Sequence, residues 1–240
     1  MSVLKKGQKR KITRLEVQKR NPRRVSVYLD GSFALGLEIR VAQEKGLHKG
    51  LELSQSQLEK LLLAEERSRA KNYALDFIGY RARSVWEVRQ RLARRDHSQE
   101  IIDDVIADLQ QAGFLDDTQF SARWAQGRMA TKPLGEHLLR KELRLKGVSQ
   151  EIVEKTVAGT FAGISQPELA TRLLETRRKR YQGLPRAKAR RRMADFLIRR
   201  GFSREAVWQA VGQIMDQGDW SDDQTPDRDL SENTSQREGR

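Results

Sequence analysis

Cysteines and long apolar runs are both missing from this chain of 240 residues. The lack of cysteine excludes disulfides, thiolate metal sites and thiol nucleophiles, and it fits a cytosolic protein. No apolar run approaches the roughly 20 residues that span a bilayer, and the basic start of the chain has no apolar stretch behind it like that of a signal peptide. We therefore expect a cytoplasmic protein.

Sequence motifs of catalysis are missing as well. The glycine-rich loops that bind phosphate, GxxxxGK before serine or threonine and GxGxxG, do not occur, and neither does the GxSxG turn of hydrolases. The three histidines are scattered, without a second histidine or an acid at metal-ligand spacing on the same helix face. We expect no enzyme activity, no cofactor and no metal ion.

Positive charge is abundant. Lysine and arginine number 47 against 33 acidic residues, which gives a formal net charge of +14. A surface this basic gains free energy by displacing counterions from phosphates. The charge therefore indicates a polyanionic partner, with nucleic acid ahead of an anionic membrane.

The first fifty residues alternate apolar and other residues with a period of two, in the segments "KITRLEVQ" and "RVSVYLDGSFALGLEI". This alternation is typical of β-strands with one buried face. Asp30 and Gly31 supply the left-handed backbone of a tight hairpin, so we predict a small antiparallel β unit. Helical periodicity begins after it, with Ser54 as a helix N-cap.

A repeat runs through the helical part of the chain. Ser98, Ser149 and Ser203 stand 51 and 54 residues apart, each with a glutamate two positions later. Basic residues lie shortly before each serine, and the second and third copies also have Gly147 or Gly201 there. This pattern predicts the end of one helix, a left-handed turn and the capped start of the next helix.

We expect a mainly α fold in which tandem repeats of three-helix units form an elongated curved rod, preceded by the small N-terminal antiparallel β unit. The last twenty residues hold six acids, three arginines and hardly an apolar side chain, which is typical of disorder. The expected parts are a basic N-terminal arm with a small β-hairpin unit at 1–53, a linking helix with repeat 1 at 54–115, repeat 2 at 116–164, repeat 3 at 165–220, and a disordered acidic tail at 221–240.

An adjacent pair of acids, Asp116 and Asp117, raises the question of metal-assisted chemistry. Magnesium sites of that kind draw further acids from elsewhere in the fold. Here the pair lies between Gly113, which ends one helix, and the next helix, which contains Phe120 and Trp124. We favour a capping role, in which one carboxylate caps the new helix and the other meets its positive dipole end.

Basic clusters are the strongest functional feature of the sequence. They lie in the second and third repeats, and although charged runs are usually solvated helix faces, the runs here are dominated by one sign, which favours contact with phosphates. The residues that we expect to contact a polyanionic partner are Arg140, Lys141, Arg144, Lys146, Arg190 and Arg191.

Aromatic residues are few, at 6% of the chain, and most fall at apolar helical positions. We expect Phe114, Phe196 and Trp208 to pack in the core, because a base-stacking platform needs an exposed ring beside a basic groove. Trp86, which precedes the glutamate of a capping box that Ser84 begins, is expected to be the most exposed of these helical rings.

Three segments carry a further indication: "ALDFIGYRARSVWEVRQRL" (74–92), "VIADLQQAGFLDDTQFSARWAQGR" (105–128) and "RKELRLKGVSQEIVEKTV" (140–157). They resemble the RecX regulatory proteins of bacteria, most specifically in an aromatic-Leu-Asp-Asp element before a helix that contains phenylalanine and ends in arginine. The resemblance covers residues 66–160 well, and the third repeat more loosely.

The resemblance implies a fold of tandem three-helix repeats without a catalytic site. It also implies a monomer that binds the RecA recombinase filament on single-stranded DNA, lodges in its helical groove and depresses ATP hydrolysis and strand exchange in DNA repair, recombination and the SOS response. The alternative from the residues alone is a stand-alone DNA-binding protein of helix-turn-helix-like units. No membrane partner is expected.

Overall fold

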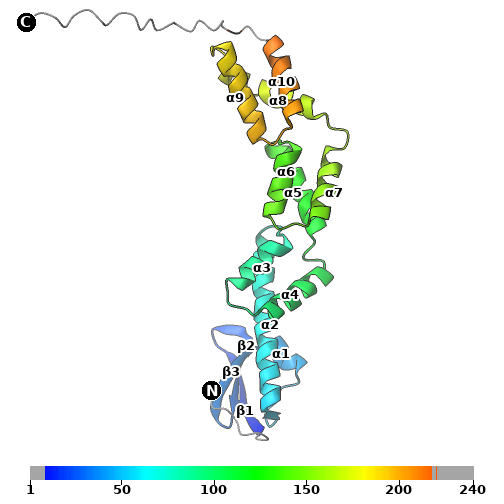
Figure 1. Ribbon diagram of the computed structural model, residues 1–240. Helices are drawn as coiled ribbons and strands as arrows, with labels where there is room; N and C mark the ends of the chain where they lie inside the picture. The colour runs from blue at the N-terminus through cyan, green and yellow to red at the C-terminus, as the bar shows by residue number, and fades with distance from the viewer. Residues whose placement is uncertain (1–8, 218–219, 221–240) are drawn as a thin grey trace, which may run out of the picture. The chain divides into compact units, whose positions relative to one another are not determined.

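The computed structural model describes residues 9–217 and residue 220, and the expected acidic tail at 221–240 lies outside the described residues (Figure 1). The chain divides into two compact units. One contains the residues up to 120 together with 146–148, and the other contains 121–145 and the residues from 149 onward.

An antiparallel sheet opens the first unit. Its strands are β1 (Lys9–Gln18), β2 (Asn21–Leu29), β3 (Ser32–Glu38) and β4 (Glu52–Ser54), in the order β3-β2-β1-β4. The predicted hairpin joins β2 and β3, and Asp30 and Gly31 both take positive φ, at 50° and 87°. The prediction of an antiparallel β unit is confirmed, but it missed β4 and the short helix α1 (Ile39–Glu44).

Helix α2 (Gln55–Tyr80) belongs to two hydrophobic cores. Ser54 and Gln57 form a capping box at its start, as expected from Ser54. Leu58 and Leu61 pack into the core of the sheet, whereas Ala70 and Ala74 pack with α3 (Val85–Ala93) and α4 (Gln99–Gln111). At 3.6 residues per turn these two pairs lie on opposite sides of the helix, so α2 shows no single apolar stripe.

The remaining helices follow the predicted repeat. They are α5 (Asp117–Thr131), α6 (Glu136–Leu145), α7 (Gln150–Phe161), α8 (Gln166–Glu175), the 3-10 turn η1 (Arg178–Arg180), α9 (Arg186–Arg199) and α10 (Arg204–Asp216). The side chains of Ser98, Ser149 and Ser203 cap α4, α7 and α10 as predicted.

The turns before these caps also match the prediction. Gly147 and Gly201 take φ of 72° and 82°, and Asp96 adopts the same left-handed conformation at 59° where the first copy lacks glycine. The mainly α fold of three-helix units behind a small antiparallel sheet is therefore confirmed. The curved rod and the boundaries between repeats stay predictions.

Candidate functional site

The two adjacent acids cap two different helices. Asp116 Oδ1 accepts hydrogen bonds from the backbone N–H groups of Thr118 and Gln119, at 2.7 and 3.0 Å, which lower the pKa of Asp116. Asp117 is half-buried, and burial raises its pKa even though its Oδ1 accepts from the backbone N–H of Val85 at 2.9 Å. The capping role is confirmed, but Asp117 satisfies the start of α3 in addition to opening α5.

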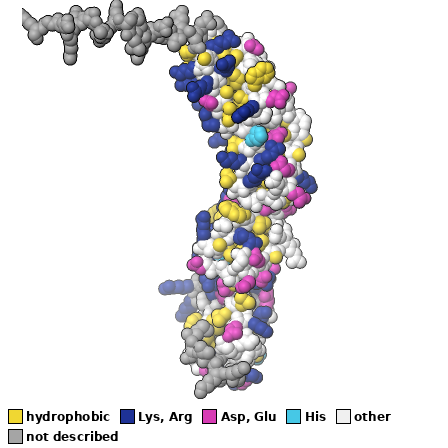
Figure 2. Space-filling model, viewed as in Figure 1, with side chains coloured by type: hydrophobic (Ala, Val, Ile, Leu, Met, Phe, Trp, Pro, Cys, Tyr) yellow, Lys and Arg dark blue, Asp and Glu magenta, His cyan; other side chains and the backbone are white. Residues whose placement is uncertain are grey.

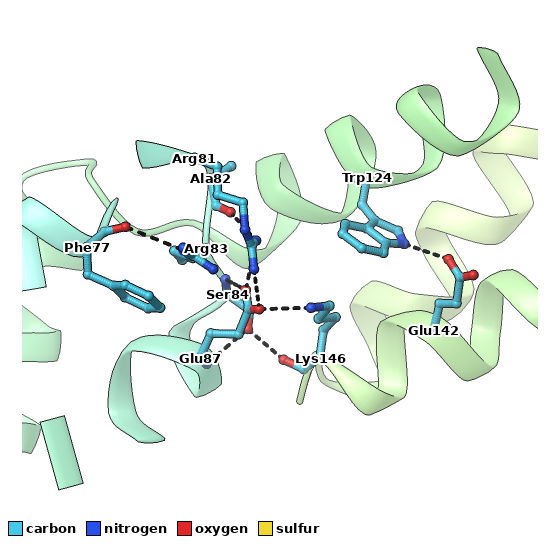
Figure 3. Close-up of polar contacts among 9 residues, drawn as sticks. All are labelled: Phe77, Arg81, Ala82, Arg83, Ser84, Glu87, Trp124, Glu142 and Lys146. Atoms are coloured by element: carbon cyan, nitrogen blue, oxygen red, sulfur yellow. Dashed lines mark hydrogen bonds and ion pairs between the residues drawn. The ribbon is translucent and has the colours of Figure 1, made fainter. Parts of the chain in front are cut away.

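Glu87 is the centre of a polar cluster at the start of α3 (Figure 3). Its Oε1 accepts hydrogen bonds from Arg81 Nη2 and Lys146 Nζ, both at 2.8 Å. Burial alone would raise the pKa of Glu87, but these hydrogen bonds and one from the Ser84 N–H outweigh it and lower the pKa to about 2. Lys146 is therefore held by an acid and is not a free cation.

Close backbone packing accompanies this cluster. Ser84 Oγ donates a hydrogen bond to the carbonyl oxygen of Lys146 at 2.6 Å. The next residue, Gly147, lies so close to Trp86 that an added Cβ would fall 2.3 Å from the Trp86 Cβ. Only glycine fits there, because the position has positive φ and no space.

The same arrangement recurs one repeat later. Gly135, at the start of α6, donates its N–H to the carbonyl oxygen of Arg200 at 2.8 Å, and His137 N–H donates to the carbonyl oxygen of Gly201 at 3.1 Å. A Cβ at Gly201 would fall 2.3 Å from the Leu138 nitrogen. The turns after α6 and after α9 thus use glycine for the same purpose, which is close approach of a helix start.

The basic residues expected on α6 are largely neutralised. Arg140 Nε donates to Glu154 Oε2 at 2.8 Å, and its Nη2 lies 3.0 Å from Glu136 Oε2. The hydrogen bond to Glu154 raises the pKa of Arg140. Arg144 Nη2 also donates to Glu154, at 3.3 Å. Of the four predicted contact residues in this stretch, only Lys141 is exposed and forms no ion pair with a described acid.

Acids within α6 also have partners inside the fold. Arg128 of α5 donates to both carboxylate oxygens of Glu142, at 2.9 and 2.7 Å, and the indole N–H of Trp124 donates to the same carboxylate at 2.9 Å (Figure 3). Glu142 therefore holds α5 and α6 together through charge-assisted bonds.

Helix α9 differs from α6, because its cations have no acidic partners. Five basic residues of α9 precede the buried Met193, and all five are exposed. Within the described part of the chain none of them forms an ion pair; they are Arg186, Lys188, Arg190, Arg191 and Arg192. No acid lies in the first turn of α9, and its N-cap, Pro185, offers no side-chain cap. In Figure 2, Lys and Arg side chains gather over the part of the surface where Figure 1 places α9.

Two expectations about the aromatic rings are wrong. Trp208 and Phe114, expected in the core, are 78% and 56% exposed, and both exceed Trp86 at 44%. Phe196 is buried as expected, with the guanidinium of Arg177 over its ring at 4.3 Å. The position of Trp208 in the helical pattern of α10 therefore predicted a buried ring, whereas the ring faces solvent.

Metal-binding clusters are missing from residues 9–217 and residue 220, where no group of three or more histidines and acids could hold an ion. Over the same residues, no helix is both long and apolar enough to cross a membrane.

Comparison with known proteins decides the family. Family models match four segments in chain order: the Regulatory protein RecX N-terminal domain at 10–54, and the first, second and third three-helix domains of RecX at 70–109, 116–157 and 165–211. The regulatory protein RecX of Halalkalibacterium halodurans is 31% identical over 208 residues, which cover 85% of this chain and 77% of that protein. The chain belongs to the RecX family of regulatory proteins.

Further RecX proteins agree with this assignment. The regulatory protein RecX of Bacillus subtilis is 30% identical over 85% of this chain and 76% of its own length. A crystal structure of regulatory protein RecX superposes with a TM-score of 0.70 at 25% identity, covering 87% of this chain and all of that one. The crystal structure of RecX from Lactobacillus salivarius shares the fold, with a TM-score of 0.57 over 63% of this chain and 97% of its own.

Proposed function

We propose that this chain binds the filament that RecA forms on single-stranded DNA and depresses its ATP hydrolysis and strand exchange, without catalysing a reaction itself. Membership of the RecX family is the observation that carries the proposal, because the name of its relatives, regulatory protein RecX, points to RecA. The acidic or phosphate-bearing surface of such a filament is also the kind of partner that a net charge of +14 favours.

The free cations are the proposed contacts. Lys141, Arg190 and Arg191 are exposed and have no ion pair among the described residues. They can therefore bind a polyanion without first breaking an ion pair within the described fold. Arg140, Arg144 and Lys146 already hold Glu136, Glu154 or Glu87, and we assign them to stability of the fold. The contact surface is therefore centred on α9.

Helix α9 is electrostatically strained in a way that a polyanion would relieve. Its five unpaired cations lie in the half of the helix nearest its N-terminus, where the helix dipole is also positive. The dipole acts within the first turn, so it opposes Arg186 and Lys188, by roughly 0.3–1 kcal/mol each at an exposed site. Phosphates or filament carboxylates placed beside α9 would turn this repulsion into attraction.

The direct test is single-strand-DNA-dependent ATP hydrolysis by the cognate RecA, with the protein titrated in at two salt concentrations. Binding of the protein to the same DNA without RecA is measured in parallel. We expect ATP hydrolysis to fall at protein concentrations too low to occupy the DNA. If the loss only follows DNA occupancy and weakens steeply with salt, the alternative of a stand-alone DNA-binding protein replaces the proposal.

A further inference from the structure

A groove between α9 and α10 carries the chemistry of a second, separate contact. It has a volume of about 950 Å³ and is lined by residues of both helices. On α9 they are Arg186, Arg190, Ala194 and Ile198, each four residues after the last, so that charge gives way to apolar surface along about 18 Å. The groove is thus basic at one end of α9 and apolar at the other.

Trp208 stands on the α10 side of this groove. Its side chain is 78% exposed, and Ile198 across the groove is 54% exposed, so a large apolar surface faces solvent. Gly212, one turn after Trp208, has open space where a side chain would be, because a Cβ there would meet no atom within 4 Å. A flat ring could therefore lie against the indole over Gly212.

Several other aromatic rings of the chain are covered by arginines. The rings of Phe77, Tyr73 and Phe196 each have an arginine guanidinium over one face, at 3.8 to 5.6 Å. Within residues 9–217 and residue 220, no such contact is made by Trp208. Its faces are available to a ligand from outside the chain.

The arginines of this groove have no acidic partners among the described residues. Arg204 lies one helical turn before Trp208 on α10, and Arg186 and Arg190 line the same groove from α9. Among the described residues, none of the three forms an ion pair, and the groove contains a single acid, Asp216. The site therefore matches a ligand that carries both repeated negative charge and flat apolar rings.

We propose that this groove binds single-stranded nucleic acid directly, with a base stacked on Trp208 and the adjoining phosphates on Arg186, Arg190 and Arg204. An exposed ring beside a basic groove is the arrangement that supports such binding, because every base has a face that can stack. Duplex DNA fits less well, since its base faces are already stacked. This inference rests on the proposed function and adds to it a direct contact between the groove and the single-stranded DNA of the filament.

The test uses the full chain and a fluorescein-labelled oligonucleotide of twenty thymidines, with binding followed by anisotropy at several salt concentrations and without RecA. We expect Trp208→Ala to weaken binding roughly tenfold and Trp208→Phe to restore most of it, because stacking needs a ring. The salt dependence of binding should not change in Trp208→Ala. A Tyr80→Ala variant, which removes an exposed ring outside the groove, should bind like the wild type.

Two further variants separate charge from stacking. Arg186→Ala with Arg190→Ala should reduce the slope of log K against log salt by about 1.4, the amount expected for two phosphate contacts to a single strand. Gly212→Leu should weaken binding by filling the space beside the indole, and it should raise thermal stability slightly, because the position is exposed, open and inside a helix where glycine is unfavourable.

Several outcomes overturn the inference. Unchanged affinity in both Trp208→Ala and Gly212→Leu would exclude stacking in the groove. Competition by duplex DNA as strong as that by the single strand would indicate a general phosphate surface, and equal competition by poly-L-glutamate would indicate a site for acidic protein segments. RecA is absent from these assays, so such a failure does not decide whether the chain inhibits the filament. That proposal is tested separately by the measurement of ATP hydrolysis.

Discussion

Helices α6 and α9 occupy the same place in consecutive three-helix units, and the turn after each ends in a glycine that a neighbouring helix start approaches closely. They differ in their charges. The cations of α6 are mostly paired with Glu136 and Glu154, whereas those of α9 form no ion pair with a described acid. A basic run in a sequence therefore forms a basic surface only where the fold pairs none of its cations with acids.

The largest loss of stability is expected at a feature that the two helices share, the glycine in the turn after each of them. Gly147→Ala and Gly201→Ala should each lower the free energy of unfolding by about 3 kcal/mol or more, since the new Cβ would overlap Trp86 or Leu138 in a positive-φ turn. Gly113→Ala is the matched control, with φ of 74° and no atom near its Cβ, and should lose only about 1 kcal/mol. Equal losses at all three glycines, measured by urea denaturation, would show that close approach is not what fixes these turns.

The next effect concerns the acid that neutralises Lys146 after α6. Glu87 has its pKa lowered from 4.5 to about 2, so its ionised form stabilises the fold above pH 4.5, and that contribution is lost as the pH falls through 2. Glu87→Gln should therefore lower the free energy of unfolding at pH 7 by on the order of 3 kcal/mol. The difference between variant and wild type should shrink as the pH falls from 4.5 toward 2.

Glu175→Gln provides the control for that experiment, since this glutamate is exposed at the end of α8. It should change the unfolding free energy by less than about 0.5 kcal/mol at any pH. A Glu87→Gln variant that is as stable as the wild type at pH 7 would mean that Lys146 and Arg81 do not depend on this carboxylate.

A smaller effect should separate the two helices directly. Arg140→Ala removes two ion pairs that are partly exposed to solvent, so it should cost about 1 kcal/mol of stability. Arg190→Ala removes no pair with a described acid and should stay within about 0.5 kcal/mol of the wild type. Thermal unfolding of both variants checks this, and a larger loss for Arg190→Ala than for Arg140→Ala would contradict the distinction between paired and free cations.

Local patterns predicted much of the fold because each depends on a few neighbouring residues. Asp30-Gly31 determined the hairpin, and the three serines with their preceding left-handed turns determined where α4, α7 and α10 begin. The short strand β4 was missed because three residues give too little periodicity to detect. The exposure of Trp208 was missed because helical spacing shows which residues share a face and not whether another element covers it.

The charged site was less predictable for a similar reason. Arg140 and Arg144 meet Glu154, which lies 14 and 10 residues further along on another helix, and Lys146 meets Glu87 at a separation of 59 residues. No local pattern shows such pairings. A sequence identifies candidate cations, but only the packing of the helices shows which of them remain free.

The most direct test of the role of α9 removes two positive charges from each helix in turn. The double variants Arg190→Ala/Arg191→Ala and Arg140→Ala/Arg144→Ala are compared in single-strand-DNA-dependent ATP hydrolysis by RecA, below the temperature at which either unfolds. We predict that the α9 variant needs about tenfold more protein for half-inhibition, because it loses two free contacts to the polyanion, and that the α6 variant changes by less than about twofold. Equal loss of inhibition in the two variants would contradict the claim that the unpaired cations of α9 carry the contact.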